Sequence, residues 1–212
     1  ICDLNEGYAI YRPRYILPDY NVYIKKGCEF LELPAPKDLD EALDGLLILY
    51  SHVPSITTFP VYIGRLDMLL DPFITDEKQD YIKIKRFLNH VDKTVPDSFC
   101  HANIGPYDTK AGRLILKAVI ELEAPTPNMT IRYDKSKTSR EFAELAAKAC
   151  LLVSKPSFAN DAYYISDLGE QYGIASCYNA LPECGGAYTL TRLRLGTIAR
   201  ACKTVDEMVN EL

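Results

Sequence analysis

The sequence lacks the residue spacing of a metal site. Its three histidines, His52, His90 and His101, are isolated from one another, and no two of its seven cysteines have C-x-x-C spacing. Structural zinc sites are built from such clustered ligands. The cysteines are also odd in number and far apart, which is not typical of a disulfide framework. We therefore expect reduced thiols and no metal ion.

The sequence also lacks an excess of basic residues and any long apolar run. The formal net charge is -5 and the pI is near 5.3, whereas nucleic-acid-binding domains usually carry a basic patch. No apolar run approaches the roughly 20 residues that cross a bilayer, and residues 1–7 lack the pattern of a signal peptide. We expect a cytoplasmic protein that binds neither nucleic acid nor membrane.

What is present is the composition of a globular protein. The 212 residues are 48% hydrophobic and 25% charged, which is sufficient for a sizeable core. The chain opens at Ile1 without an initiating Met and stops at Leu212, within or just after an amphipathic segment with helical spacing. Both ends therefore have the character of cuts, and we expect the chain to be part of a larger protein.

The first half of the sequence predicts helices between irregular segments. Residues 1–38 are rich in tyrosine and proline and predict loops and short strands. Apolar residues then recur at helical spacing from Leu39 until Pro54, with Asp38 as the N-cap. Further helices are predicted at residues 64–70, at 77–90 after Asp76 as a cap, and at 109–123, with a loop at 96–107.

The second half alternates strands with helices. Residues 128–133 are rich in β-branched and aromatic side chains and predict a strand, and Thr138-Ser139-x-Glu141 is a capping box for the helix that follows. The alternation indicates parallel strands with helical crossovers, and hence an α/β fold. The later predicted segments are a helix at 140–152, an extended stretch at 157–165, a helix at 166–172, a loop after Gly173, and helices at 189–202 and 205–212.

Cys177 occupies a position where catalytic groups are common. It follows a strand and helix and enters a loop that contains Pro182 and two glycines, so rigid elements could hold a reachable thiol. Most cysteines are nevertheless small buried apolar residues. A thiol paired with one of the histidines would be a nucleophile, which leaves a Cys-dependent acyltransferase or hydrolase as one alternative. No local signature of those families surrounds Cys177 or Cys184.

TPNMTIRY, PSFAND and YGIASC follow one another in an order that resembles the glycyl radical enzymes, the family of pyruvate formate-lyase. TPNMTIRY at residues 126–133 is similar to the family's P-N-L-S-V-R strand, and PSFAND at 156–161 is similar to its P-x-F-F-N-D. YGIASC at 172–177 is similar to the Y-G-x-x-G-C segment that ends in the radical cysteine. Upstream, GRLD at 64–67 and the stretch at 105–112 resemble G-R-L-D-Q and G-G-x-D-x-x-G.

This resemblance implies a fold and a mechanism. The family's ten-stranded α/β barrels consist of two parallel half-sheets wrapped in helices, and a cysteine loop projects into the sealed interior. Cys177 matches the residue that becomes a thiyl radical, after a glycyl radical installed by a radical-SAM activating enzyme takes its hydrogen. The chain would be an internal fragment of one catalytic barrel, with residues 1–60 irregular and helical and residues 61–212 as the core. Homodimers are common in the family.

Two departures from the family limit the reaction that can be inferred. The glycyl motif R-V-x-G-[YF] is absent from these 212 residues, so the resemblance implies a radical glycine beyond Leu212. Dehydratases of the family carry Glu two residues after the cysteine, where this chain has Asn179, and Asn does not exchange protons near neutral pH. The adjacent cysteine pair of pyruvate formate-lyase is also missing. The Cys-Tyr-Asn loop is most similar to the YjjI-type branch.

Other polar residues are candidates for a radical lyase or dehydratase acting on a small polar metabolite. Glu183 could replace the missing acid/base, and Cys184 could supply a second thiol. The candidates for binding the substrate are Asn160, Asp161, Asn179 and His101, although Asx residues also end strands and a single histidine is often structural. A binding or structural module that keeps the barrel without radical chemistry is the second alternative.

Overall fold

The protein is built around a parallel sheet. The computed structural model describes residues 15–56, 61–94, 100–124, 126–175, 179–187 and 195–210. Four parallel strands lie side by side in the order β2 (Tyr62–Arg65), β3 (His101–Ile104), β4 (Asn128–Tyr133) and β5 (Ser157–Asn160). This sheet confirms the predicted α/β fold with parallel strands. The parallel sheet of the described residues has four strands. The ten-stranded barrel stays a prediction.

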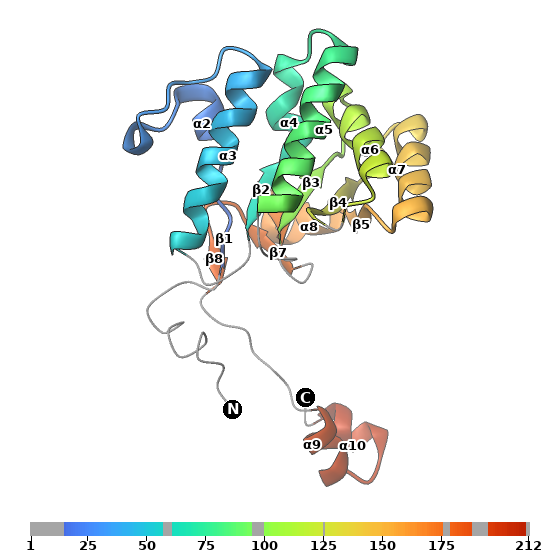
Figure 1. The fold of residues 1–212 in the computed structure, drawn as a ribbon. Helices are drawn as coiled ribbons and strands as arrows, with labels where there is room; N and C mark the ends of the chain where they lie inside the picture. Colours follow the sequence, from blue (N-terminus) through green and yellow to red (C-terminus); the bar gives the residue numbers. More distant parts are fainter. Residues whose placement is uncertain are drawn as a thin grey trace.

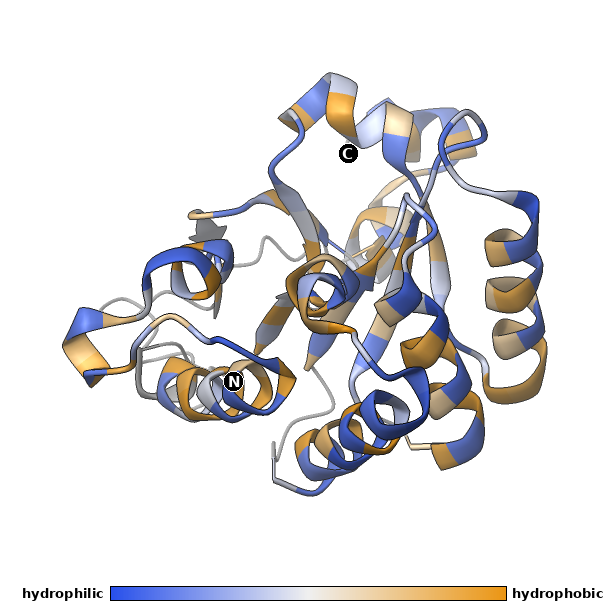
Figure 2. Cartoon of the chain, turned by 90° about the horizontal axis from the view of Figure 1, so that it is seen from above, coloured by the Kyte–Doolittle hydropathy of each residue, from blue (hydrophilic) through white to orange (hydrophobic). Residues whose placement is uncertain are grey.

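The crossovers between neighbouring strands place helices on one side of the sheet. The chain passes through α4 (Leu66–Leu70), η2 (Asp71–Phe73) and α5 (Glu77–Thr94) before β3, α6 (Lys110–Leu122) before β4 and α7 (Arg140–Val153) before β5. Together with α3 (Leu39–Ile56) these helices form a layer above the sheet (Figure 1). Figure 2 shows that hydrophobic and hydrophilic residues alternate along them, as expected for helices with one buried face.

The core lies between this helix layer and the sheet. Strand residues on the helix side are fully or almost fully buried: Ile63, Ala102, Ile104, Met129 and Ile131. Helix residues of the same buried cluster include Leu46, Leu88, Ile115, Leu116 and Phe142. Burying one such large apolar side chain stabilises a fold by about 1.5–3 kcal/mol. The helix layer therefore holds the sheet rigidly and leaves its other face available for different contacts.

The helix starts that the sequence predicts are confirmed by their caps. The Asp38 carboxylate accepts a hydrogen bond from the backbone N–H three residues later at 2.9 Å. Asp76 accepts from the N–H two residues later at 3.0 Å, and the Ser139 hydroxyl accepts from Phe142 at 3.1 Å. These bonds satisfy N–H groups that have no partner inside their helices.

Three predictions in the first half of the chain differ from the structure. Residues 96–107 contain the strand β3 and not only a loop, because pairing with β2 and β4 extends a segment whose Ala and Asn have low strand propensity. Gly64 and Arg65 belong to β2, and the helix begins at Leu66. Within the part predicted as loops and strands, residues 21–26 form the helix α2 (Asn21–Lys26), followed by η1 (Glu29–Leu31).

The boundaries after β5 also differ from the prediction. The extended stretch ends at Asn160, whose side chain accepts a hydrogen bond from the Tyr163 N–H at 3.2 Å and caps α8 (Asp161–Leu168). Tyr172 begins a strand and does not end a helix. The strands β6 (Tyr172–Ala175) and β7 (Asn179–Pro182) pair antiparallel, where the sequence predicts a loop. Cross-strand pairing, which no local pattern reports, decides this element.

The remaining elements are short. β1 (Tyr15–Ile16) pairs antiparallel with β8 (Gly186–Ala187). α9 (Leu195–Ala201) and α10 (Val205–Asn210) confirm parts of the two last predicted helices and lie apart from the sheet in Figure 1. Within the ranges that the structure describes, no helix combines the length and apolarity that crossing a membrane requires.

Candidate active site

The face of the sheet opposite the helices carries buried polar side chains. Successive strand residues point to opposite faces, so His101 and Asn103 of β3 and Thr130 and Arg132 of β4 share this inner face. Each of these four residues is at most 1% exposed. Burying polar groups costs free energy unless they are hydrogen-bonded. The inner face therefore differs from the helix side, because it buries polar side chains that need hydrogen-bond partners.

Asn103 binds the backbone of β6. Its side-chain oxygen accepts a hydrogen bond from the Ile174 N–H at 2.7 Å, and its side-chain N–H₂ donates to the Ile174 carbonyl at 2.9 Å. The amide thus occupies the place of a peptide group on a neighbouring strand. β6 is held on its other edge by β7, where Ile174 pairs with Ala180. The hairpin of β6 and β7 (the β6–β7 hairpin below) is therefore attached to the inner face through β6.

A buried ion pair attaches the beginning of β6. Arg132 Nε donates to Asp161 Oδ1 at 2.7 Å, and both side chains are almost completely inaccessible to solvent. The Tyr172 hydroxyl donates to the same carboxylate oxygen at 2.8 Å, and Arg132 Nη1 donates to the Tyr172 carbonyl at 3.1 Å. The guanidinium also lies 3.8 Å from the centre of the Tyr172 ring. Removing one member of such a pair typically costs about 3–5 kcal/mol.

A third contact reaches the end of β7. The Tyr62 hydroxyl donates to Glu183 Oε1 at 3.1 Å. Burial raises the pKa of Glu183, while the hydrogen bond from Tyr62 and the positive charge of Arg65 oppose that shift. The ring of Tyr62 packs so closely on Gly173 that an added Cβ there would lie 2.5 Å from the ring. The glycine of the YGIASC segment therefore allows the hairpin to approach β2.

The two upstream motifs meet at Asp67. Its Oδ2 accepts hydrogen bonds from the Gly105 N–H at 2.8 Å and from the Thr109 hydroxyl at 3.3 Å, and Oδ1 accepts from Met68 N–H at 2.8 Å. Burial raises the pKa of Asp67 to about 6, against the lowering effect of these bonds and of Arg65. Asp67 of the first motif thus connects α4 to Gly105 of the second, just after the carboxyl end of β3.

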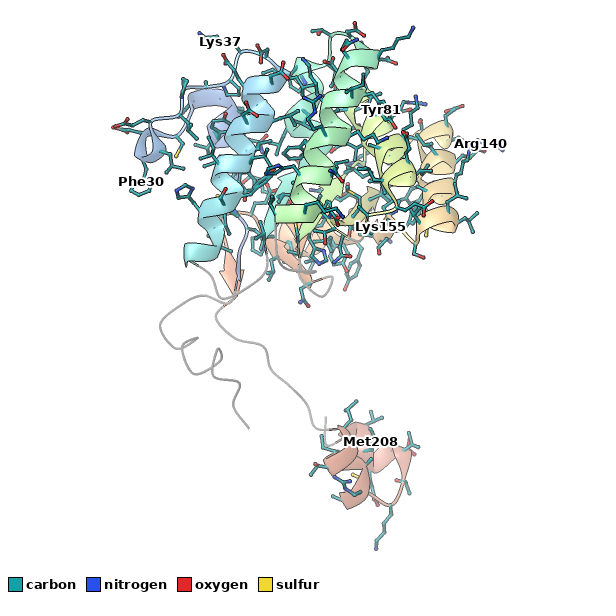
Figure 3. The ribbon with its side chains drawn as sticks, in the orientation of Figure 1. Phe30, Lys37, Tyr81, Arg140, Lys155 and Met208 are labelled. Carbon is teal, nitrogen blue, oxygen red and sulfur yellow. The ribbon has the colours of Figure 1, made fainter. Side chains whose placement is uncertain are left out.

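His101 lies at the start of β3 and not in a loop. Its ring is buried on the inner face, two residues before Asn103. Burial lowers its pKa to about 4, and the positive charge of Lys155 adds to that effect. Lys155, labelled in Figure 3, donates to the carbonyls of Ala124 and Pro127 at 2.6 and 3.1 Å. At neutral pH the imidazole is therefore uncharged.

The two predicted thiols and Glu183 do not lie together in the described structure. Cys177 lies outside the described residues, and the nearest described residues on each side, Ala175 and Asn179, are cross-strand partners. Cys184 is exposed and adopts a φ of 62°, and its N–H donates to the Leu17 carbonyl at 2.7 Å. Glu183 follows Asn179 by four residues, which is roughly 13 Å along an extended strand. The structure therefore separates Glu183 and Cys184 from Asn179.

Asn160 and Asp161 already have structural partners. Asn160 caps α8, and the Asp161 carboxylate accepts from Arg132, Tyr172 and Lys137, the last at 3.4 Å. The sequence did not point to Asn103, Arg132 or Asp67 as members of the site. The PNMTIRY and GRLD motifs contain Arg132 and Asp67, so the motif match was a usable signal for these two. Nothing local marks Asn103, because its partner lies 71 residues away.

A pocket of about 260 Å³ lies beside the hairpin. The described residues around it are uncharged and include Thr130, Asn160, Tyr164 and Ile174. The Thr130 hydroxyl is buried and hydrogen-bonds with none of the residues that the structure describes. Among the residues that the structure describes, no three His, Cys, Asp or Glu side chains gather in a group that could hold a metal ion. The described cysteines are free thiols: Cys28, Cys100, Cys150, Cys184 and Cys202.

Known proteins match the whole chain. The family model described as "Glycyl radical enzyme YjjI-like" matches residues 1–212. A Haemophilus influenzae protein described as uncharacterized is 92% identical over 212 residues, which are all of this chain and 41% of that protein. The Escherichia coli (strain K12) protein described as "Uncharacterized protein YjjI" is 48% identical over 210 residues, 98% of this chain and 41% of its own length. The chain thus spans about two fifths of each relative.

Proposed function

The chain belongs to the YjjI-like glycyl radical enzyme family, and from this premise we propose that it forms the thiyl-bearing part of a radical enzyme. In this proposal Cys177 becomes a transient thiyl radical and takes a hydrogen atom from a small polar metabolite, in a reaction of the lyase or dehydratase type. The full-length protein would close the four-stranded sheet into the family's ten-stranded barrel of two half-sheets. The whole chain, residues 1–212, would be an internal part of that one catalytic domain.

The observation that carries the proposal is the attachment of the β6–β7 hairpin. The hairpin strands on either side of Cys177 are bound to the inner face by Asn103, by Arg132 with Asp161, and by Tyr62. Catalytic groups need support from rigid elements whose own contacts are fixed, because a displacement of about 1 Å can cost about a hundredfold in rate. Several buried polar side chains, whose burial costs free energy, are thus used to hold one short hairpin.

In the proposed reaction this chain would transfer hydrogen atoms through the Cys177 sulfur and would shield that sulfur from water. A glycyl radical located beyond Leu212 would accept the hydrogen atom of the Cys177 thiol when both are in place. The sulfur would then take a hydrogen atom from a substrate C–H bond, so that an S–H bond re-forms as the C–H bond breaks. The residues of the inner face would hold the sulfur in position and keep water out, since a closed site prevents side reactions of a reactive species.

The substrate would lie in the pocket beside β6. Uncharged residues line it among those described, and Thr130 offers a buried hydroxyl that lacks a partner there. This lining favours a small neutral molecule with hydroxyl or carbonyl groups over a carboxylate or an ammonium ion. Of the predicted substrate-binding residues, Asn160 lines this pocket. Asn179 and His101 are proposed to contact the substrate from outside its described lining, and Asp161 is proposed to contribute indirectly through Arg132.

Proton exchange with the substrate is proposed for Glu183, since Asn179 is unable to do it. Burial raises the Glu183 pKa, which brings its titration closer to neutral pH, as is useful in a general acid. A second thiol function for Cys184 would require its exposed side chain to be covered by the rest of the protein. The proposed partners are a radical-SAM activating enzyme and a second copy of the protein, in the cytoplasm.

Anaerobic activation of the full-length protein by its activating enzyme, followed by EPR spectroscopy, tests the proposal. We expect the doublet of a glycyl radical, whose one remaining α-hydrogen splits the signal. No doublet with an activating enzyme shown to be active on another substrate protein would contradict radical chemistry. That outcome would favour a binding module on the same fold. Turnover that persists in air would instead favour a Cys-dependent acyltransferase or hydrolase.

A further inference from the structure

We propose that Asn103 is a positioning residue that fixes how far the β6–β7 hairpin extends along the inner face of the sheet. The geometric part of this inference needs only the described residues. Its consequence for hydrogen transfer at Cys177 rests on the proposed function. Asn103 belongs to none of the segments that resemble the glycyl radical enzymes, so its role follows from its contacts alone.

The two hydrogen bonds of Asn103 constrain one residue of β6 in both directions. The Ile174 N–H and carbonyl bind the same side-chain amide, at 2.7 and 2.9 Å. A slip of β6 by one residue would move it by about 3.3 Å and turn every side chain to the opposite side. Such a slip would break both bonds. The Asn103 amide therefore selects one register for a strand that has no backbone pairing with the sheet.

Asn103 is itself held rigidly. It lies in β3, an inner strand of the sheet that pairs with β2 on one side and with β4 on the other. Its flanking residues, Ala102 and Ile104, are fully buried in the core beneath the helices. A short side chain on such a backbone has few rotamers with which to follow a moving partner. The position of Ile174 is thus set by the sheet and not by flexible contacts.

The other attachments do not provide this constraint. Arg132 holds Tyr172 at the beginning of β6, and Tyr62 holds Glu183 just beyond the end of β7. Arg132 Nη1 binds only the carbonyl of Tyr172, and Tyr62 binds the side chain of Glu183 and not the hairpin backbone. Asn103 binds Ile174, which is three residues from Cys177 in the sequence. Among the described contacts of β6, the one at Asn103 therefore controls the position of the following residues most directly.

Two variants of the full-length protein separate positioning from simple attachment. Asn103→Leu keeps the approximate volume and removes both hydrogen bonds. Asn103→Gln keeps both groups on an arm that is one methylene longer. Tyr50→Phe is the matched control, because the Tyr50 hydroxyl also donates to a buried strand carbonyl, that of Ile63 at 2.9 Å, but on the helix side.

The first measurement is amide hydrogen exchange in the protein before activation. Asn103→Leu should raise the exchange rate of the Ile174 N–H by at least about tenfold, since that group loses its acceptor. Tyr50→Phe should leave the Ile174 rate close to that of the wild type. Unchanged protection of Ile174 in Asn103→Leu would overturn the inference, whether or not the protein is a radical enzyme.

The second measurement is the EPR doublet in D₂O. Transfer of deuterium from the Cys177 S–D to the glycyl carbon, followed by return of the original hydrogen to sulfur, replaces the splitting α-hydrogen and collapses the doublet to a singlet. We expect Asn103→Leu and Asn103→Gln to form the doublet and to slow its collapse by about tenfold or more.

Collapse at the wild-type rate in both variants would overturn the positioning role. A wild-type protein without a doublet would count against the proposed function and leave the exchange result standing. If Asn103→Leu does not fold, Asn103→Gln decides on the collapse rate alone.

Discussion

At the scale of single residues, the two thiols near the β6–β7 hairpin differ in their surroundings. Cys184 is exposed, and its main described contact is the hydrogen bond of its backbone N–H to Leu17. Cys177 is flanked by the paired residues Ala175 and Asn179 of a hairpin that three buried side chains attach to the sheet. Hydrogen transfer needs a sulfur that is firmly held in a closed site, and the exposed side chain of Cys184 has no such surroundings among the described residues.

We therefore expect Cys177→Ala to abolish turnover in the full-length enzyme while the glycyl radical still forms. Cys184→Ala should keep substantial activity, because its side chain contributes no described contact to the inner face. Activity measured together with the EPR signal distinguishes loss of chemistry from loss of activation. The reverse pattern of the two variants would show that Cys184 carries the radical.

Asp67 makes stability depend on pH in a predictable direction. Burial raises its pKa from 3.8 to about 6 in the folded protein, so the folded state holds the proton more tightly than the unfolded state. The free energy of unfolding should therefore fall as the pH rises from about 4 to about 6, by roughly 3 kcal/mol in total. Asp67→Asn should remove this fall. Urea unfolding across that pH range measures it, and an equal fall in both proteins would exclude Asp67 as the cause.

At the scale of elements, the β6–β7 hairpin depends on a close approach of its backbone to β2. A Cβ at Gly173 would lie 2.5 Å from the Tyr62 ring and 2.9 Å from Leu17. Neither neighbour can move far, since both are buried in the core. The hairpin is thus attached by hydrogen bonds at its edge and fits against an aromatic ring on its side.

Gly173→Ala should destabilise the protein by about 1–3 kcal/mol, the usual cost of an overpacked core. It should also weaken the Tyr62 to Glu183 hydrogen bond, because the ring has to shift. Gly196→Ala in α9 is the control, since nothing lies within 4 Å of an added Cβ there, and a helical alanine is favoured over glycine by about 1 kcal/mol. Thermal unfolding compares the two. Equal melting temperatures for both variants would contradict the close approach.

At the scale of the whole molecule, the proposed radical reaction would need residues that lie beyond this chain. The chain spans 41% of the length of the relatives that it matches, and the glycyl motif does not occur in its 212 residues. We expect the 212-residue chain by itself to show no turnover, because the proposed reaction requires the radical glycine in the same site. Incubation with candidate metabolites, analysed by mass spectrometry, tests this. Turnover by the isolated chain would revive a thiol nucleophile paired with a histidine.

Several features of this protein are determined by its local sequence. Asp38, Asp76 and Ser139 begin helices because their side-chain oxygens bind N–H groups within the next turn. Residues 128–133 form a strand because their β-branched and aromatic side chains favour one. The alternation of such segments predicts parallel strands, and the ordered motifs indicate the family. Each single segment or motif is read from residues only a few positions apart.

The tertiary structure decided the rest, because the partners involved are distant in the sequence. β3 is a strand only through its neighbours β2 and β4, and the β6–β7 hairpin exists through cross-strand pairing. Asn103 meets Ile174 across 71 residues, and Arg132 meets Asp161 across 29. No propensity or spacing reports which buried polar group will find which partner. The sequence therefore pointed to Cys177, while the inner face of the sheet determines what holds the strands around it.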